Sequence, residues 1–148
     1  MNKELIIKKS ILVNADSSAV WEALTNPAQT KIYFLGCEVI SEWKVGESIV
    51  YRDNTEETPV VHVDGILKHY EEGKMFEYAC RIPLRKADGT PGDMIRVSFE
   101  LEDENGKIRV TLTQDCGGNE QIYNNSDAGW DFVLHGLKNL VEKSSRKE

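Results

Sequence analysis

The stretch NEQIYNNSDAGWDFVLHGLKNLVEKSS, residues 119–145, decides the fold, because it is the only long helical pattern in the chain. Asn119 is a suitable N-cap, and a helix of some 25 residues would span about 37 Å at 1.5 Å per residue. That length is enough to cross a whole β-sheet. Successive residues of a helix are about 100° apart, which gathers a set of apolar residues into a narrow arc. This arc contains Tyr123, Trp130, Leu134, Leu137 and Val141.

Gly129 and Gly136 lie just beyond one edge of that arc. Glycine inside a helix costs about 0.5–1 kcal/mol relative to alanine, so both positions need a physical reason. One explanation is that strands crowd the helix closely. The other is that the helix and the sheet do not close fully and leave a cavity for a ligand. The two explanations are compatible.

Upstream of this helix, the chain reads mainly as β-strands. ELIIKKSILV, residues 4–13, alternates as a strand, and NADSSAVWEALTNP, residues 14–27, opens a short helix that Asn26 and Pro27 end. Polar turns containing glycine separate the later strands, and such short links predict antiparallel hairpins. The six further strands are expected at residues 36–43, 47–53, 60–70, 74–82, 93–103 and 107–115.

Strand alternation predicts a sheet with a single covered face. Apolar residues alternate with polar ones from Ile95 to Leu101 and again from Ile108 to Leu112. Gln114 continues the apolar parity as a polar exception, which makes it the best candidate for a group that orients a ligand. Ser126, in the first turns of the long helix, is the second candidate. Either side chain could instead be satisfied by backbone groups near the end of its element.

Composition and charge exclude several classes of function. With 25 acidic and 18 basic residues the net charge is −7, which argues against nucleic acid and anionic membrane surfaces as partners. No apolar run is long enough for a signal peptide or a membrane span, so we expect a cytoplasmic protein. Neither the cysteines nor the histidines have metal-ligand spacing, and no nucleophile elbow or phosphate loop occurs. We therefore assign no catalytic residue, metal ligand or cofactor.

Aromatic side chains suggest a binding cavity between the sheet and the long helix. Their rings can line a pocket while a hydroxyl or indole N–H orients a ligand, although each could equally be plain core. The candidate ligand-binding residues are Trp21, Tyr33, Trp43, Tyr51, Tyr78, Phe99, Gln114, Ser126, Trp130, Leu134 and Leu137.

Four segments carry a family resemblance: ADSSAVWEALTNP (15–27), SEWKVGESIVYR (41–52), VDGILKHYEEGKMFEYAC (63–80) and AGWDFVLHGLKNLVEK (128–143). With the order of elements, they resemble the START-like, polyketide-cyclase superfamily, in the branch of homologues of the activator of heat-shock protein 90 ATPase. The resemblance implies an α+β helix-grip domain over residues 1–148. A seven-stranded antiparallel sheet would curve around the C-terminal helix and a hydrophobic cavity, with two short helices after the first strand. Where many members of the branch carry a tryptophan pair, this chain has Tyr33 and Phe34.

The functional expectation is non-enzymatic binding of a small hydrophobic or amphipathic ligand, lipid-like or aromatic. One alternative is a co-chaperone that docks on heat-shock protein 90 and speeds its ATPase. Another is a cyclase or hydrolase in which Tyr78, Tyr33 or Gln114 polarises a carbonyl. Phe132 is apolar on the expected solvent side of the helix, which hints at a partner surface, including that of a homodimer.

Overall fold

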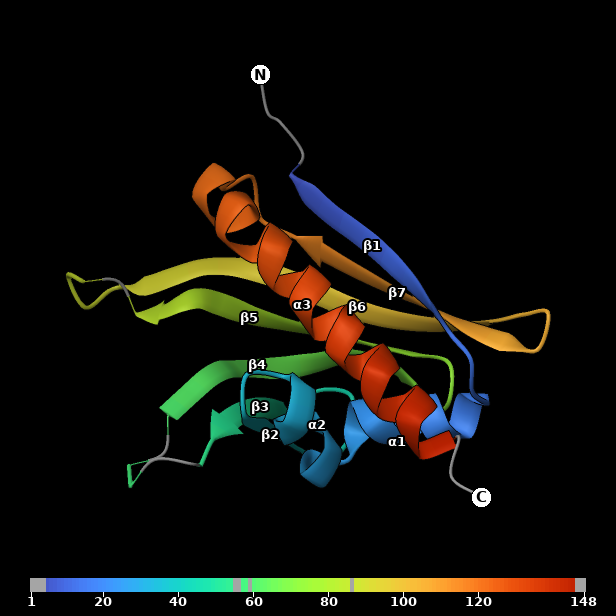
Figure 1. Cartoon of the computed structure of the whole chain (residues 1–148). Coiled ribbons are helices and arrows are strands. Elements are labelled where there is room, and N and C mark those ends of the chain that lie inside the picture. The colour runs from blue at the N-terminus through green and yellow to red at the C-terminus, as the bar shows by residue number, and fades with distance from the viewer. Residues whose placement is uncertain (1–4, 55–56, 59, 86, 146–148) are drawn as a thin grey trace.

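One curved antiparallel sheet carries the fold, and a long helix lies diagonally across its concave face (Figure 1). The computed structural model describes residues 5–54, 57–58, 60–85 and 87–145. The strands are β1 (Ile6–Val13), β2 (Cys37–Ser41), β3 (Ser48–Asp53), β4 (Val60–Glu71), β5 (Met75–Arg85), β6 (Pro91–Glu104) and β7 (Lys107–Asp115). The helices are α1 (Ser17–Thr25), α2 (Pro27–Tyr33) and α3 (Glu120–Ser145). The predicted α+β helix-grip architecture, with two short helices after the first strand, is confirmed.

The sheet has seven strands in the order β1-β7-β6-β5-β4-β3-β2. Each strand from β2 to β6 is hydrogen-bonded to the next strand in the chain, as the short turns predicted. β1 pairs instead with β7, because α1 and α2 carry the chain to the opposite edge of the sheet. Tyr78, Val97 and Gln114 thereby face one another in a row across β5, β6 and β7.

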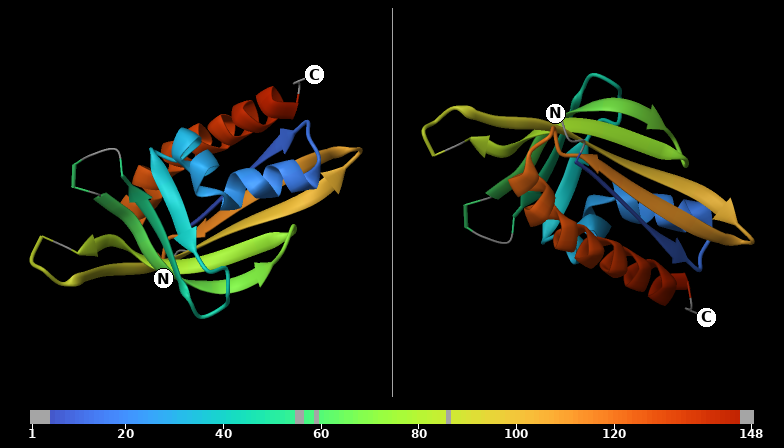
Figure 2. Two further views of the ribbon diagram at one scale, coloured as in Figure 1. Left: turned by 90° about the horizontal axis from the view of Figure 1, so that it is seen from below. Right: turned by 90° about the horizontal axis from the view of Figure 1, so that it is seen from above.

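The concave face of the sheet is the dry one, and all three helices lie on that side (Figure 2). Along β6, Ile95, Val97 and Phe99 are buried, whereas Arg96 and Glu100 between them are exposed. This is the period-2 pattern of a half-covered sheet, and it confirms the single dry face that was predicted.

Side-chain caps begin and end the short helices. The Asp16 carboxylate accepts a hydrogen bond from the backbone N–H of Ala19 at 2.9 Å and caps α1. Asn26 ends α1 and also begins α2, because its side chain accepts from the N–H of Ala28 at 2.8 Å. Pro27 follows at the first helical position, where its missing N–H costs nothing.

Helix α3 begins at the predicted cap, where the Asn119 side chain accepts from the N–H of Ile122 at 3.0 Å. Lys9 of β1 then holds the helix to the sheet edge, with Nζ 3.2 Å from Asp127 and 3.1 Å from Asp131. Near the other end, Lys138 Nζ donates to the carbonyl of Leu12 at 3.0 Å. The helix is therefore fastened along β1, and its C-terminal half also packs against α1 and α2.

No helix among the described residues combines the length and the apolar character needed to cross a bilayer. Within the same residues, no group of three or more histidine, cysteine or acidic side chains converges as a metal site would require.

Candidate functional site

A cavity of about 240 Å³ lies between the sheet and the N-terminal half of α3. Strands β4 to β7 supply one wall, formed by Val63, Tyr78, Cys80, Ile95, Val97 and Gln114. The opposite wall comes from α3 and the segment after α2, and it consists of Phe34, Leu35, Asn125, Ser126, Gly129, Trp130 and Val133. His62 completes the lining.

The two glycines of α3 have different structural surroundings, which explain why each position can be glycine. A Cβ atom on Gly136 would lie 2.8 Å from Cβ of Tyr33, so this glycine lets α2 pack directly against α3. A Cβ atom on Gly129 would meet nothing within 4 Å, and Gly129 lines the cavity. Close packing therefore explains Gly136, and open space explains Gly129.

Gln114 links the sheet to the helix beside this cavity. Its side-chain carbonyl accepts a hydrogen bond from the indole N–H of Trp130, and its amide nitrogen donates to Ser126 Oγ at 3.2 Å and to Cys116 Sγ at 3.6 Å. Gln114 is only 1% exposed, so these bonds satisfy an amide that would otherwise be costly to bury. Its partners are side chains, two of them from α3, rather than backbone groups.

Removal of this amide should destabilise the protein measurably. In Gln114→Ala the indole N–H of Trp130 loses its acceptor and a buried void is left. We expect the free energy of unfolding to fall by about 2–4 kcal/mol. Urea unfolding monitored by tryptophan fluorescence measures the change, with exposed Gln121→Ala as the control. A loss below about 0.5 kcal/mol would contradict a structural role for the Gln114 hydrogen bonds.

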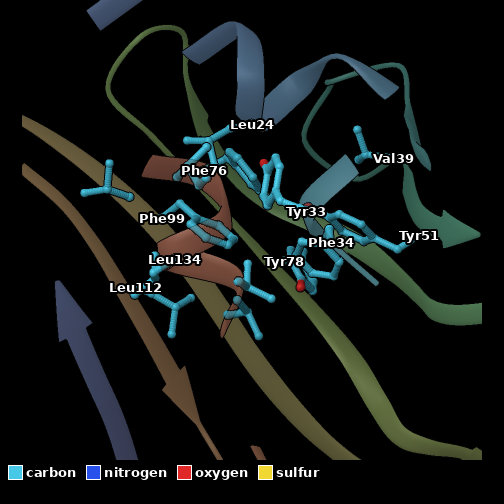
Figure 3. Close-up of a cluster of buried hydrophobic side chains, with 14 of the residues drawn as sticks. Leu24, Tyr33, Phe34, Val39, Tyr51, Phe76, Tyr78, Phe99, Leu112 and Leu134 are labelled. Atoms are coloured by element: carbon cyan, nitrogen blue, oxygen red, sulfur yellow. The ribbon is translucent and has the colours of Figure 1, made fainter. Parts of the chain in front are cut away.

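Tyr78 is the most deeply buried hydroxyl of the lining, at 1% exposure. Its hydroxyl makes no hydrogen bond to the described part of the chain, and it is open to the cavity rather than enclosed by protein. Tyr33 differs, because its hydroxyl donates to the carbonyl of Ala23 at 2.7 Å. In Figure 3 the two hydroxyl oxygens point to opposite ends of the aromatic cluster. Burial, with a smaller contribution from Tyr51, raises the pKa of Tyr78 well above its ordinary value, so the phenol stays neutral.

Cys37, Cys80 and Cys116 are all free and buried. Burial, assisted by nearby Asp64, raises the pKa of the Cys80 thiol to about 12 from an ordinary 9.0. Burial, assisted by Asp53, raises the pKa of Cys37 to about 11. These thiols keep their protons at neutral pH and are poor nucleophiles.

The raised thiol pKa values predict a loss of stability in alkali. Unfolded cysteines release their protons near pH 9, whereas folded Cys37 and Cys80 hold theirs until about pH 11 and 12. The folded state then binds more protons, so the free energy of unfolding should be flat below roughly pH 8 and decline above roughly pH 9. Urea unfolding with a reductant across this range measures the decline, and Cys80→Ala should make it shallower. A constant stability up to about pH 11 would refute the prediction.

The cavity brings together four of the predicted binding residues: Tyr78, Gln114, Ser126 and Trp130. Tyr51 lies behind the lining, stacked on Phe34 with ring centroids 4.4 Å apart. Phe99 also lies behind it, with its ring edge-on to that of Trp130 at 5.9 Å.

The remaining predicted residues lie elsewhere in the core. Trp21 and Trp43 form a separate cluster in which both contact Tyr70 and Phe76, with ring centroids 5.1–5.8 Å apart. Tyr33 packs beneath Gly136. Leu134 and Leu137 are buried in the hydrophobic core and do not reach the cavity.

Several lining residues were not among the predicted binding residues. Cys80, Ile95 and Val97 share strand parity with Tyr78 or Gln114, so the alternation pattern could have identified them as lining residues. No sequence pattern could have identified Leu35, because its placement depends on a left-handed backbone conformation with φ 54°. A branched side chain in that conformation is uncommon and occurs here at the cavity wall, with Leu35 exposed.

Apart from His62, the lining consists of uncharged side chains. Among the described residues, no lysine, arginine, aspartate or glutamate contributes to it. A buried charge on a ligand would therefore find no opposite charge to pair with, and burial of an unpaired charge is costly. The cavity is suited to a neutral molecule.

The sequence and the fold of this chain are similar to those of known proteins. The model of the family described as "Activator of Hsp90 ATPase homolog 1-like protein" matches residues 14–142. The solution structure of ChR145 from Cytophaga hutchinsonii is 30% identical, with a TM-score of 0.75, over 99% of this chain and 100% of that one. A comparison with curated proteins gives no significant match.

Two more distant structures share the fold. The solution structure of the Aha1 dimer from Colwellia psychrerythraea is 19% identical with a TM-score of 0.70, and the match covers 93% of this chain and 97% of that one. DynU16, a protein in the dynemicin biosynthetic locus, is 18% identical with a TM-score of 0.77. That match covers 96% of this chain and 49% of DynU16.

Proposed function

The chain belongs to the family of Activator of Hsp90 ATPase homolog 1-like proteins, and from this premise we propose that it binds a small, neutral, aromatic molecule in the cavity beneath Gly129. The observation that carries the proposal is an open space with aromatic walls and no acidic, lysine or arginine side chain, which lies at Gly129, where a Cβ atom would meet no neighbour within 4 Å. We propose a cytoplasmic location for this binding.

The volume of the cavity limits the size of the ligand. At the packing density of protein interiors, about 0.74, a space of about 240 Å³ holds roughly 180 Å³ of atoms, or about twelve non-hydrogen atoms. A fused pair of rings with one substituent fits this volume, whereas a long acyl chain or a sterol would have to protrude from the open side of the cavity. Of the two ligand kinds predicted from the sequence, the size argument favours the aromatic one over the lipid.

The walls are suited to flat rings. Phe34 and Trp130 meet edge to face with centroids 5.8 Å apart, and Tyr78 stands on the facing sheet. Aromatic rings favour such edge-to-face and offset contacts with one another. About twelve atoms at roughly 0.5 kcal/mol each correspond to a dissociation constant on the order of 10–100 μM.

Native mass spectrometry of freshly purified protein, followed by extraction, tests the proposal. We expect an adduct of a small aromatic compound, or, from an empty protein, a thermal shift with neutral bicyclic aromatics. A co-purified lipid would contradict the size argument. A clean apo mass on repeated preparations, together with no thermal shift from an aromatic panel, would contradict the proposed function.

An exposed apolar patch favours a second candidate function, that of a protein partner. Ile32 of α2 is 63% exposed and Phe132 of α3 is 67% exposed, and both line a shallow groove with Leu140. Exposed apolar residues that gather in this way often mark protein interfaces. The family name suggests heat-shock protein 90 as the partner, and the Colwellia structure is of a dimer, which suggests a second copy of the chain.

Phe132→Ser separates these partner roles from the cavity. An increase in chaperone ATPase on adding the wild-type protein, lost in Phe132→Ser, would support the co-chaperone. A dimer in sedimentation that the same variant dissociates would support the homodimer. If the wild-type protein does not increase the chaperone ATPase and sediments as a monomer, both partner roles are excluded.

The predicted cyclase or hydrolase would use the same cavity. Neutral Tyr78 could polarise a carbonyl there, but no described carboxylate lines the cavity to act as a general base. Turnover of a bound aromatic substrate that Tyr78→Phe abolishes without loss of binding would establish it.

A further inference from the structure

Two hydroxyl groups of the cavity have protons that no described residue accepts. Tyr78 has no hydrogen bond at its hydroxyl within the described part of the chain. Ser126 Oγ accepts from Gln114 at 3.2 Å, and no described group accepts the proton of Ser126 in return. Among the described residues, Arg52 Nε is the one fully buried side-chain polar atom that lacks a partner, so both of these hydroxyls are open to the cavity and can donate to a ligand there.

The two donors stand on opposite walls of the same space. Tyr78 and Gln114 both face Val97, one from β5 and one from β7, so their Cα atoms are about 10 Å apart across three strands. Ser126 lies on α3, and its hydroxyl oxygen accepts a hydrogen bond from the Gln114 amide. A ring system between the sheet and the helix would therefore lie between the two hydroxyls.

The neighbouring hydrogen bonds form a chain that ends at the Ser126 hydroxyl. The Trp130 indole N–H donates to the Gln114 carbonyl, and the Gln114 amide donates to Ser126. Each bond in such a chain polarises the next, which strengthens the Ser126 hydroxyl as a donor at its end. No described carboxylate lines the cavity, so no anionic acceptor there competes with a ligand oxygen for these protons.

We propose that the cavity selects neutral aromatic ligands that carry a carbonyl-type acceptor oxygen, and that Tyr78 is the residue that recognises this oxygen, with Ser126 as the second donor. The inference rests on the proposed function and names the chemical class of its ligand. Tyr78 keeps its proton because burial raises its pKa, so the preference should hold throughout the neutral range.

Two bicyclic probes of nearly equal shape test the assignment: α-tetralone, which has a ring carbonyl, and tetralin, which lacks it. Their dissociation constants are measured by titration with wild-type protein, Tyr78→Phe and Tyr51→Phe. Tyr78→Phe keeps the ring and removes only the donor. Tyr51→Phe is the matched control, because Tyr51 is equally buried in the same cluster but does not line the cavity.

We expect Tyr78→Phe to raise the dissociation constant of α-tetralone by roughly three- to tenfold, as loss of one hydrogen bond predicts. The dissociation constant of tetralin should stay within about twofold of its wild-type value. Tyr51→Phe should change neither probe. Equal effects of Tyr78→Phe on both probes, or no effect on either, would overturn the assignment while the proposed function stands. If wild-type protein binds neither probe, both the assignment and the proposed function fail.

Discussion

Gly136→Ala is expected to lower the free energy of unfolding by about 1–3 kcal/mol, although alanine is the better helix former. The new Cβ atom would lie 2.8 Å from Cβ of Tyr33, with the Cα and carbonyl oxygen of Tyr33 at 3.6 and 3.7 Å. These atoms belong to the stem and backbone of α2 and cannot swing away as the end of a flexible side chain would. The strain therefore has to be relieved by moving one helix against the other.

Gly129→Ala is the matched control on the same helix. Its Cβ atom meets nothing within 4 Å, so the helix propensity of alanine should raise the free energy of unfolding by about 0.5–1 kcal/mol. For a chain of this size, 1 kcal/mol corresponds to a change of about 2–4 °C in the melting temperature. Calorimetry of the two variants should show shifts of opposite sign. Shifts of the same sign would contradict the close packing of α2 on Gly136.

Gly129→Leu is expected to abolish binding of small aromatic molecules, with at least a tenfold rise in their dissociation constants. Gly129 is exposed and lines the cavity, so we expect the leucine side chain to cover the open side of the cavity or to fill part of its space of about 240 Å³. Because the position is open, the fold should tolerate the change, and the melting temperature should not fall. Isothermal titration with α-tetralone and with tetralin measures the effect. Unaltered affinity in a folded variant would mean that these molecules bind elsewhere.

Much of the fold could be predicted because it depends on local patterns. The hairpin turns set the strand order from β2 to β7, and the alternation along β6 and β7 fixed which face is covered. The apolar arc of α3 identified Leu134, Leu137 and Val141 as buried. The pairing of β1 with β7 was not predicted, because it joins the two most distant strands of the chain and no short-range pattern indicates it.

The position of the cavity could not be predicted from those patterns. Trp130 and Leu137 share one helical arc, yet Trp130 lines the cavity and Leu137 is core. The difference arises because α2 packs on α3 at Gly136 and not at Gly129, which is a tertiary contact between distant segments. For the same reason, Trp21 and Trp43 could not be distinguished in sequence from the aromatic residues of the cavity.

The polar groups of the cavity could be predicted only in part from the sequence. Strand parity singled out Gln114, and the helical arc singled out Ser126, so both candidates were named from the sequence. Their mutual hydrogen bond, and the bond from Trp130, depend on how α3 is placed over β7. The vacant hydroxyl of Tyr78 depends on what its neighbours leave unpaired, which no pattern along one strand can show.

The central claim is that the space beneath Gly129 binds a small neutral aromatic molecule, and an NMR titration of isotope-labelled protein with α-tetralone tests it most directly. The claim predicts saturable shifts at the Trp130 indole N–H and at the amides of Gly129 and Val97, and their absence in Gly129→Leu. No shifts at saturating probe, or shifts centred on Ile32 and Phe132 that persist in Gly129→Leu, would contradict the claim.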